Sequence, residues 1–183
     1  ALPRGGVLVG AEIARKLHLP LDILVTRKIG APFQPEVAIG AVTQDGAVLL
    51  HEKLIKNGGI TSAYVQAEAA RQRQEIARRL AVLRGKRPLP DWQGREVLLV
   101  DDGIATGFTV RAAIHGLRAA GAAAVWLAVP VAARDTMEAL SREVDRSTVL
   151  LAPDDFYAVG QFYRDFRQIE DEEVEQALAD APR

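Results

Sequence analysis

The chain contains 183 residues, a length that suits one compact domain. Hydrophobic residues make up 49% of it and charged residues 26%, so a predominantly disordered chain is excluded. The 23 basic and 24 acidic residues give a formal net charge of −1, without the basic excess that is typical of a nucleic-acid-binding domain. The absence of cysteine excludes disulfides, thiolate metal sites and cysteine nucleophiles.

The sequence contains neither a run of about 18 apolar residues nor the pattern of a secretory signal. We therefore expect a cytoplasmic protein with no membrane partner. The first residue is Ala1 rather than Met, and it leads directly into the loop-like stretch Pro3–Gly6. One interpretation is that the chain is a fragment, or part of a fusion, and lacks an N-terminal strand of its sheet.

The N-terminal part of the chain alternates between helical and strand-like periodicity. Apolar residues at helical spacing predict a helix from Val7 to Leu17, which ends before Pro20. Short apolar runs predict three strands, over residues 22–26, 37–42 and 47–51. The pair Asp45-Gly46 favours a hairpin between the last two strands.

Residues 52–94 are predicted to form a long insertion that contains a mobile loop and a helix. Asn57-Gly58-Gly59 marks a flexible break, and Thr61 to Arg84 carries the longest helical pattern in the chain. Basic residues dominate the second half of this segment and its end: Arg71, Arg73, Arg78, Arg79, Arg84, Lys86, Arg87 and Arg95. They are interpreted first as a solvated helix face, with a pyrophosphate-guiding lid and a dimer surface as the alternatives.

Strands and helices alternate through the second half of the chain. Strands are predicted over 96–100, 124–131 and 148–151, and helices over the apolar periods 110–117 and 137–144. The acidic run 170–173 is expected to begin a final helix, where negative charge suits the helix dipole. This alternation is typical of an α/β fold with a central, mostly parallel sheet flanked by helices. We therefore predict a single domain over residues 1–183.

The most informative run extends from Val97 to Thr109. Its apolar strand ends in Asp101-Asp102, and a loop of small residues with two hydroxyl groups then opens a helix. Open α/β sheets bind ligands at the carboxyl ends of their strands, and the free N–H groups at a helix start bind phosphate. Paired carboxylates beside such a cradle suit a ribose 5-phosphate. An acidic pair alone also occurs in receiver domains, and Thr-Gly can simply cap a helix, so the whole run is more specific than its parts.

This run resembles the phosphoribosyl pyrophosphate (PRPP) signature of type I phosphoribosyltransferases: an apolar strand, two acidic residues, two apolar residues, then small-Thr-Gly-any-Thr. Gly103 departs from it, because a branched apolar residue is usual there. Three further segments resemble the family in the expected order: Leu2–Gly6 its pyrophosphate loop, Arg27-Lys28 a basic pair after the second strand, and 155–166 the hood over the base. We call residues 153–169 the hood segment.

The resemblance implies a role for each matching residue. The catalytic residues would be Asp101 and Asp102, which accept hydrogen bonds from the ribose hydroxyls, and Lys28, which reaches the pyrophosphate or the base. The 5-phosphate would be bound by Ala105, Thr106, Gly107, Phe108 and Thr109. The pyrophosphate would be bound by Arg4, Gly5, Gly6 and Arg27. The base would be bound by Tyr157, Val159 and Asp165. Either Tyr157 or Phe156 could stack on a flat base or belong to the core. The peptide bond Pro3–Arg4 is expected to be cis.

The resemblance also implies an enzyme that transfers the phosphoribosyl group of PRPP to a nitrogen of a nucleobase-like acceptor and releases pyrophosphate. Mg²⁺ is the implied cofactor, held mainly by substrate and water, so no protein ligand is assigned to it. A homodimer is expected, and nucleic acid is not expected as a partner. Ala105 stands where hypoxanthine–guanine members usually have Asp, and the acceptor base stays open. The alternative function is a non-catalytic, PRPP-sensing module that binds nucleic acid or protein.

Overall fold

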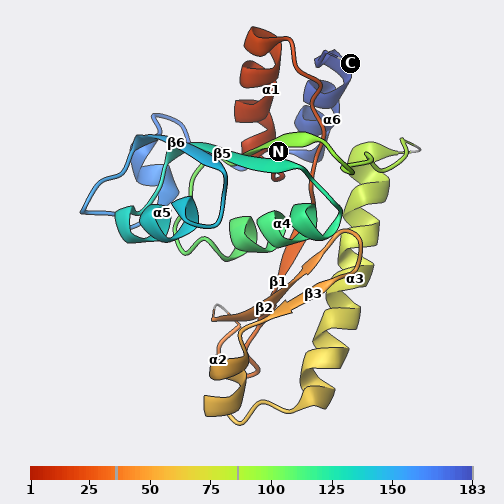
Figure 1. Ribbon diagram of the computed structural model, residues 1–183, viewed down its shortest axis with the longest axis vertical. Coiled ribbons are helices and arrows are strands. Elements are labelled where there is room, and N and C mark those ends of the chain that lie inside the picture. Colours follow the sequence, from red (N-terminus) through yellow and green to blue (C-terminus); the bar gives the residue numbers. More distant parts are fainter. Residues whose placement is uncertain (36, 86, 183) are drawn as a thin grey trace.

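Two three-stranded sheets organise the computed structural model, which describes residues 1–35, 37–85 and 87–182 (Figure 1). The antiparallel sheet has the order β1-β2-β3 and is formed by β1 (Thr26–Gly30), β2 (Ala38–Thr43) and β3 (Val48–Leu50). The parallel sheet has the order β4-β5-β6 and is formed by β4 (Glu96–Val100), β5 (Ala124–Val131) and β6 (Arg146–Leu151). The predicted α/β class with a parallel sheet and flanking helices is therefore confirmed.

The helices are arranged around these sheets, with α4 between them and α3 running along the antiparallel sheet (Figure 1). In chain order they are α1 (Gly5–Leu17), α2 (Glu52–Asn57), α3 (Ser62–Arg84), α4 (Phe108–Ala119), α5 (Arg134–Ser141) and α6 (Asp171–Asp180), with a short 3₁₀ helix η1 (Val159–Phe162) in the hood segment. Among the described residues, none of the helices has both the length and the apolar character needed to cross a bilayer.

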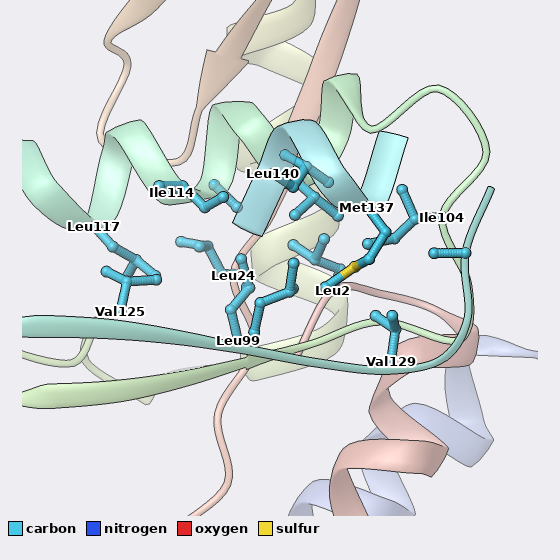
Figure 2. Packing of buried hydrophobic residues seen from close by; sticks show 14 residues of the cluster. Leu2, Leu24, Leu99, Ile104, Ile114, Leu117, Val125, Val129, Met137 and Leu140 are labelled. Atoms are coloured by element: carbon cyan, nitrogen blue, oxygen red, sulfur yellow. The ribbon is translucent and has the colours of Figure 1, made fainter. Parts of the chain in front are cut away.

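One hydrophobic core lies between the parallel sheet and helices α4 and α5 (Figure 2). Burial alternates along β5, so that Val125, Leu127 and Val129 point into this core and the residues between them are partly exposed. Ile114 and Leu117 of α4 fill it from the helix side. Each such side chain contributes about 1.5–3 kcal/mol by leaving water. This packing fixes the carboxyl end of β4, where the predicted site begins.

A second core joins the antiparallel sheet to α3 and α6. The predicted apolar stripe of α3 is buried at Val65, Ala69, Ile76 and Leu83, and it packs with residues of β1, β2 and α6. The C-terminal helix α6 begins with the predicted acidic run and carries a capping box between Glu170 and Glu173. The segment 52–94 is therefore built largely of two helices, of which α3 is packed on the sheet; its closure over a substrate stays a prediction.

Two N-terminal elements differ from the prediction. The strand predicted over 22–26 is displaced: the ladder with β2 begins at Thr26, whereas Leu24 donates its N–H to the carbonyl of Ala1 at 3.0 Å. The apolar residues 23–25 are buried, as their hydrophobicity predicts, but they do not pair with β2. Helix α1 begins at Gly5, and its buried face includes Gly6, Val7, Gly10 and Ala14, while Leu17 is 58% exposed. Small residues form this face because the helix lies close to Ala1 and β4.

Three of the five arginines of α3 form ion pairs with the two glutamates of the same helix. Arg71 pairs with Glu68 at 2.6 Å, and Arg78 pairs with Glu75 at 2.9 Å, each across one turn. Both guanidinium groups are mostly exposed, as a solvated helix face requires. Arg84 differs, because it is buried and forms an ion pair with Asp22.

Candidate functional site

The acidic pair and the start of α1 meet at the carboxyl end of β4. Asp101 and Asp102 follow the strand directly, and the N–H of Leu2 donates to the carbonyl of Val100 at 2.8 Å, so residues 3–6 lie beside the pair. A Cβ atom on Gly5 would overlap Oδ2 of Asp102. The predicted pyrophosphate loop and the predicted ribose-binding carboxylates are therefore in van der Waals contact.

Gly6 likewise lies close to Asp101, the first residue of the acidic pair. A Cβ atom at this position would lie 2.8 Å from the Cα of Asp101 and 3.0 Å from its Oδ1. Glycine is thus required by the close approach of two backbones rather than by an unusual backbone angle. The Pro3–Arg4 peptide bond is cis, as predicted.

The carboxyl groups of Asp101 and Asp102 are largely buried and lie close to each other. Burial, as the largest cause, and the neighbouring Asp102 together raise the pKa of Asp101 to about 8, against a hydrogen bond from the Asp102 N–H to Asp101 Oδ1 at 3.0 Å. Burial also raises the pKa of Asp102. The pair therefore retains a proton near neutral pH and favours a ligand that brings hydrogen-bond donors or positive charge.

The loop after the pair leads into an open helix end. Ile104 bridges to Ala132, and Thr136 donates its hydroxyl to the carbonyl of Ala105 at 2.8 Å, which holds the loop on the sheet edge. Gly107 has φ 73° and forms the N-cap of α4, and no side chain caps this end of the helix within the described chain. Ala105, Thr106 and Thr109 are exposed. Free N–H groups with two hydroxyls at a helix start can bind a phosphate.

The hood segment is fastened to the acidic pair from the other side. The hydroxyl of Tyr163 donates to the carbonyl of Asp102 at 2.6 Å, and burial together with the two nearby carboxylates raises the pKa of Tyr163 to about 12. A Cβ atom on Gly103 would overlap Val159 of η1 and lie 3.0 Å from Val131. Gly103 departs from the usual pattern, and the space that its side chain would fill is occupied by Val159.

The remaining hood residues are arranged differently. Phe156 stacks on Phe162 with ring centroids 5.5 Å apart, so it belongs to the packing of the hood. Tyr157 is 86% exposed, and Asp165 is exposed as well. Val159 is thus the predicted base-binding residue that contacts the acidic loop, whereas the side chains of Tyr157 and Asp165 lie in solvent.

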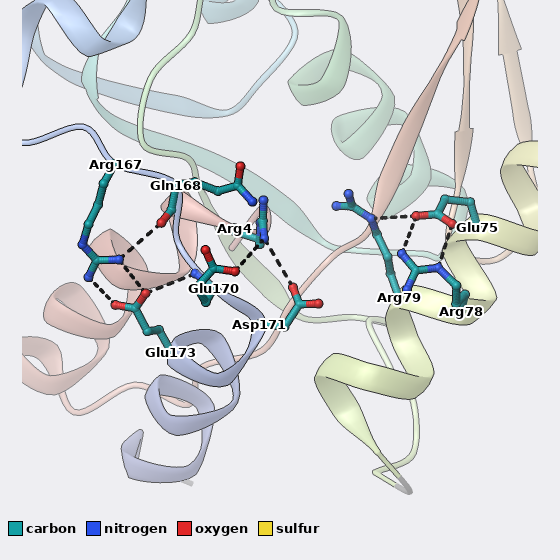
Figure 3. Close-up of polar contacts among 9 residues, drawn as sticks. All are labelled: Arg4, Glu75, Arg78, Arg79, Arg167, Gln168, Glu170, Asp171 and Glu173. Carbon is teal, nitrogen blue, oxygen red and sulfur yellow. Dashed lines mark hydrogen bonds and ion pairs between the residues drawn. The ribbon is translucent and has the colours of Figure 1, made fainter.

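The predicted basic residues point in different directions. The Arg4 guanidinium lies 3.9 Å from Glu170 and 3.8 Å from Asp171, at the start of α6 (Figure 3). Arg27 extends toward α3, where its Nε donates to Gln72 at 3.0 Å, and burial lowers the pKa of this guanidinium. Lys28 is the exposed residue of β1.

Several residues of the site were not predicted from the sequence. Tyr163 lies within the hood segment, but no role was predicted for it. Gln72 is 3% exposed and also donates to Glu68 at 2.7 Å, so it connects α3 to Arg27. Gln72 lies in the buried stripe Val65–Ala69–Gln72–Ile76 of α3. A polar residue at such a position could have indicated from the sequence that its side chain has a buried hydrogen-bond partner. The acids that face Arg4 were interpreted only as a helix start.

The chain that forms this site matches a known protein family. The sequence model of the phosphoribosyl transferase domain matches residues 1–167, and the chain therefore belongs to the phosphoribosyl transferase domain family. Proteins of two strains of Mycobacterium tuberculosis, each named "Putative phosphoribosyl transferase", are 43% identical over 173 residues. The match covers 94% of this chain and 39% of theirs, so the chain spans about two-fifths of the length of these relatives.

The chain is also similar to a solved structure. The crystal structure of TT1426 from Thermus thermophilus superposes on this chain with a TM-score of 0.84 and 42% sequence identity. The superposition covers 97% of this chain and 84% of that one. The chain therefore shares the fold of that structure.

The contact between Gly103 and Val159 predicts a coupled pair. Gly103→Ala should lower the free energy of unfolding by about 1–3 kcal/mol, because the new methyl group overpacks against Val159. In a Val159→Ala background the same change should cost at least about 1 kcal/mol less. Urea unfolding of the two single variants, the double variant and the parent protein measures this coupling. Additive effects of the two substitutions would contradict the contact.

The raised pKa of Asp101 predicts how stability depends on pH. Between the unfolded value near 3.8 and the folded value of about 8, the folded state binds the proton more tightly, so its stability falls as pH rises. Asp101→Asn cannot ionise and should be more stable than the parent at pH 8, by about 1–3 kcal/mol, with the difference shrinking toward pH 5. Urea unfolding at several pH values tests this, with Asp135→Asn on the exposed start of α5 as the control. Parallel pH profiles for the parent and Asp101→Asn would refute the burial of this charge.

Proposed function

We propose that this chain is a PRPP-dependent phosphoribosyltransferase that joins a nitrogen of a nucleobase-like acceptor to the 5-phosphoribosyl group and releases pyrophosphate. The observation that carries the proposal is the meeting of three segments at one sheet edge. Asp101-Asp102 contacts the glycine pair Gly5-Gly6, and the uncapped start of α4 follows the acidic pair after the short loop 103–107. The acidic pair would accept hydrogen bonds from the ribose hydroxyls. The glycine pair would let the pyrophosphate approach the backbone, and the start of α4 would bind the 5-phosphate.

The geometry supports a defined orientation of PRPP. The 5-phosphate would bind the N–H groups of residues 105–109 with the hydroxyls of Thr106 and Thr109. The ribose hydroxyls would donate to Asp101 and Asp102, and the pyrophosphate would lie on Gly5 and Gly6. The bond between the anomeric carbon and the pyrophosphate oxygen breaks, the acceptor nitrogen bonds to that carbon and then loses its proton. The chain contributes mainly by positioning the reactants and by stabilising charge.

The basic residues and the hood would complete this arrangement. Arg4 lies at the start of the glycine pair and would bind the pyrophosphate in place of its present acidic neighbours. Arg27 and Lys28 project from adjacent positions of β1, toward α3 and toward solvent respectively. Lys28 would reach the leaving group or the acceptor, as the family resemblance implies. The exposed ring of Tyr157 is available to stack on a flat acceptor, next to Val159.

Mg²⁺ is proposed as the cofactor. Within the described chain, no group of three or more His, Asp or Glu side chains could hold a metal ion by itself. The carboxylates of Asp101 and Asp102 fit a metal that arrives with the substrate, because Mg²⁺ commonly takes one or two carboxylates together with phosphates and water. When bound, Mg²⁺ would neutralise charge on the pyrophosphate. Its positive charge would also favour loss of the proton from the acidic pair.

The acidic pair supplies the direct test of this proposal. Asp101→Asn and Asp102→Asn should each lower kcat/KM for PRPP by roughly 10- to 100-fold, the effect of losing one charge-assisted hydrogen bond. Pyrophosphate release with PRPP, Mg²⁺ and a panel of purine and pyrimidine bases measures this, with Asp135→Asn as the matched exposed control. Calorimetric titration of PRPP separates binding from turnover.

The two outcomes that oppose the proposal are distinct. If the parent protein neither binds PRPP nor releases pyrophosphate with any base, the transferase assignment is wrong. If it binds PRPP with an affinity that Asp102→Asn abolishes but shows no turnover, a regulatory PRPP-sensing module is favoured instead. A homodimer is also proposed by family likeness, and sedimentation of the protein during the same work tests it.

A further inference from the structure

A second cavity lies on the side of α4 that faces the β2–β3 hairpin. Its volume is about 470 Å³, within the range of pockets that hold small ligands. No residue of the acidic pair, of the loop 3–6 or of the hood segment lines it among the described residues. Phe108 of the proposed phosphate loop also lines it, so the cavity adjoins the proposed PRPP site at the start of α4, but it shares no other described residue named for that site.

One wall of this cavity is apolar. Leu49 and Leu50 of β3 and Phe108 of α4 line it, with Gly40 of β2 beneath them. Gly40 cannot carry a side chain, because a Cβ atom would lie 2.5 Å from the carbonyl oxygen of Leu49. This wall can cover the flat or apolar body of a ligand.

The other wall is rich in cationic groups. Arg111 and His115 lie four positions apart and so share one face of α4, and His51 and Lys53 approach from the start of α2. His51 accepts a hydrogen bond from the N–H of Leu54 at its Nδ1, at 3.3 Å. The neutral ring therefore carries its proton on Nε2 and presents a donor there.

A single carboxylate lines the described part of this cavity. Glu143 accepts two hydrogen bonds from Nε of Arg111, at 2.8 and 3.1 Å, and lies 4.0 Å from Nε2 of His115. This contact orients the guanidinium through Nε and leaves its two terminal nitrogens without a partner among the described residues. A planar fork of this kind matches the geometry of a phosphate group.

We propose that this cavity binds a small phosphorylated ligand with an aromatic or apolar body. Arg111, Lys53 and the two histidines would hold the phosphate, and Leu49 and Phe108 would cover the body. Lys53 and Arg111 give this cavity two fixed positive charges against the one negative charge of Glu143. The proposed PRPP site differs, because it contains the acidic pair Asp101-Asp102. The site is independent of whether the chain catalyses phosphoribosyl transfer.

The three histidines of the chain allow a direct test. His51 and His115 line the cavity, whereas His18 lies at the C-cap of α1 and serves as an internal control. Titration with adenosine 5′-diphosphate should shift the ring resonances of His51 and His115 in NMR spectra and leave those of His18 in place. Inorganic pyrophosphate, which lacks the aromatic body, should shift the same resonances with weaker affinity.

Substitutions at the cavity should act in opposite directions. Lys53→Gln and Arg111→Gln should each weaken binding of the diphosphate about tenfold, as expected for one charge-assisted hydrogen bond. Glu143→Gln removes the opposing carboxylate and should strengthen binding, an effect that general loss of structure could not produce. Asp102→Asn, at the proposed PRPP site, should leave these histidine shifts unchanged.

Two results would overturn the proposal. Resonances of His51 and His115 that stay fixed at millimolar diphosphate would show that the cavity does not bind this class of ligand. Shifts that Asp102→Asn abolishes would assign the binding to the PRPP site instead.

Discussion

The contact between the acidic pair and the glycine pair is the constraint on which the rest of the site depends. Two segments that are far apart in the sequence meet there without a side chain between them, because Gly5 and Gly6 have none. The carboxylates are thereby partly removed from water, which raises their pKa values, and the backbone amides at the start of α1 are placed beside them. One close approach of two backbones thus places paired hydrogen-bond acceptors beside backbone amides, the arrangement on which the proposed PRPP site depends.

The hood segment depends on the same sheet edge. Tyr163 is tied to the backbone of Asp102, and Val159 fills the space that a side chain at position 103 would take. The space beside Gly103 is therefore occupied by Val159 rather than empty. The acidic loop and the hood are thus joined both by a hydrogen bond from the Tyr163 hydroxyl to a backbone carbonyl and by a tight apolar contact.

Much of this arrangement could be predicted from the sequence. The strands 96–100 and 124–131 were predicted with the bounds that the structure shows, because both are apolar runs closed by clear loop residues. The strand at 22–26 was misplaced, since apolar residues report burial and not the partner strand. The direction of Arg4 and Arg27 could not be predicted, because it depends on Asp171 and Gln72, which reach the site only through tertiary packing.

The charge distribution explains why a nearly neutral chain can serve anionic ligands. On α3, Arg71 and Arg78 are each paired with a glutamate one turn away, but the helix carries five arginines and two glutamates and so keeps a net positive charge. Arg4 faces Glu170 and Asp171 at 3.9 and 3.8 Å, distances at which partly exposed ion pairs are weak. In the proposed complex, a pyrophosphate on the glycine pair would carry more charge and would approach along the backbone amides as well. It would therefore replace these carboxylates as the partner of Arg4 at little cost, and the acids would keep the guanidinium near its position until then.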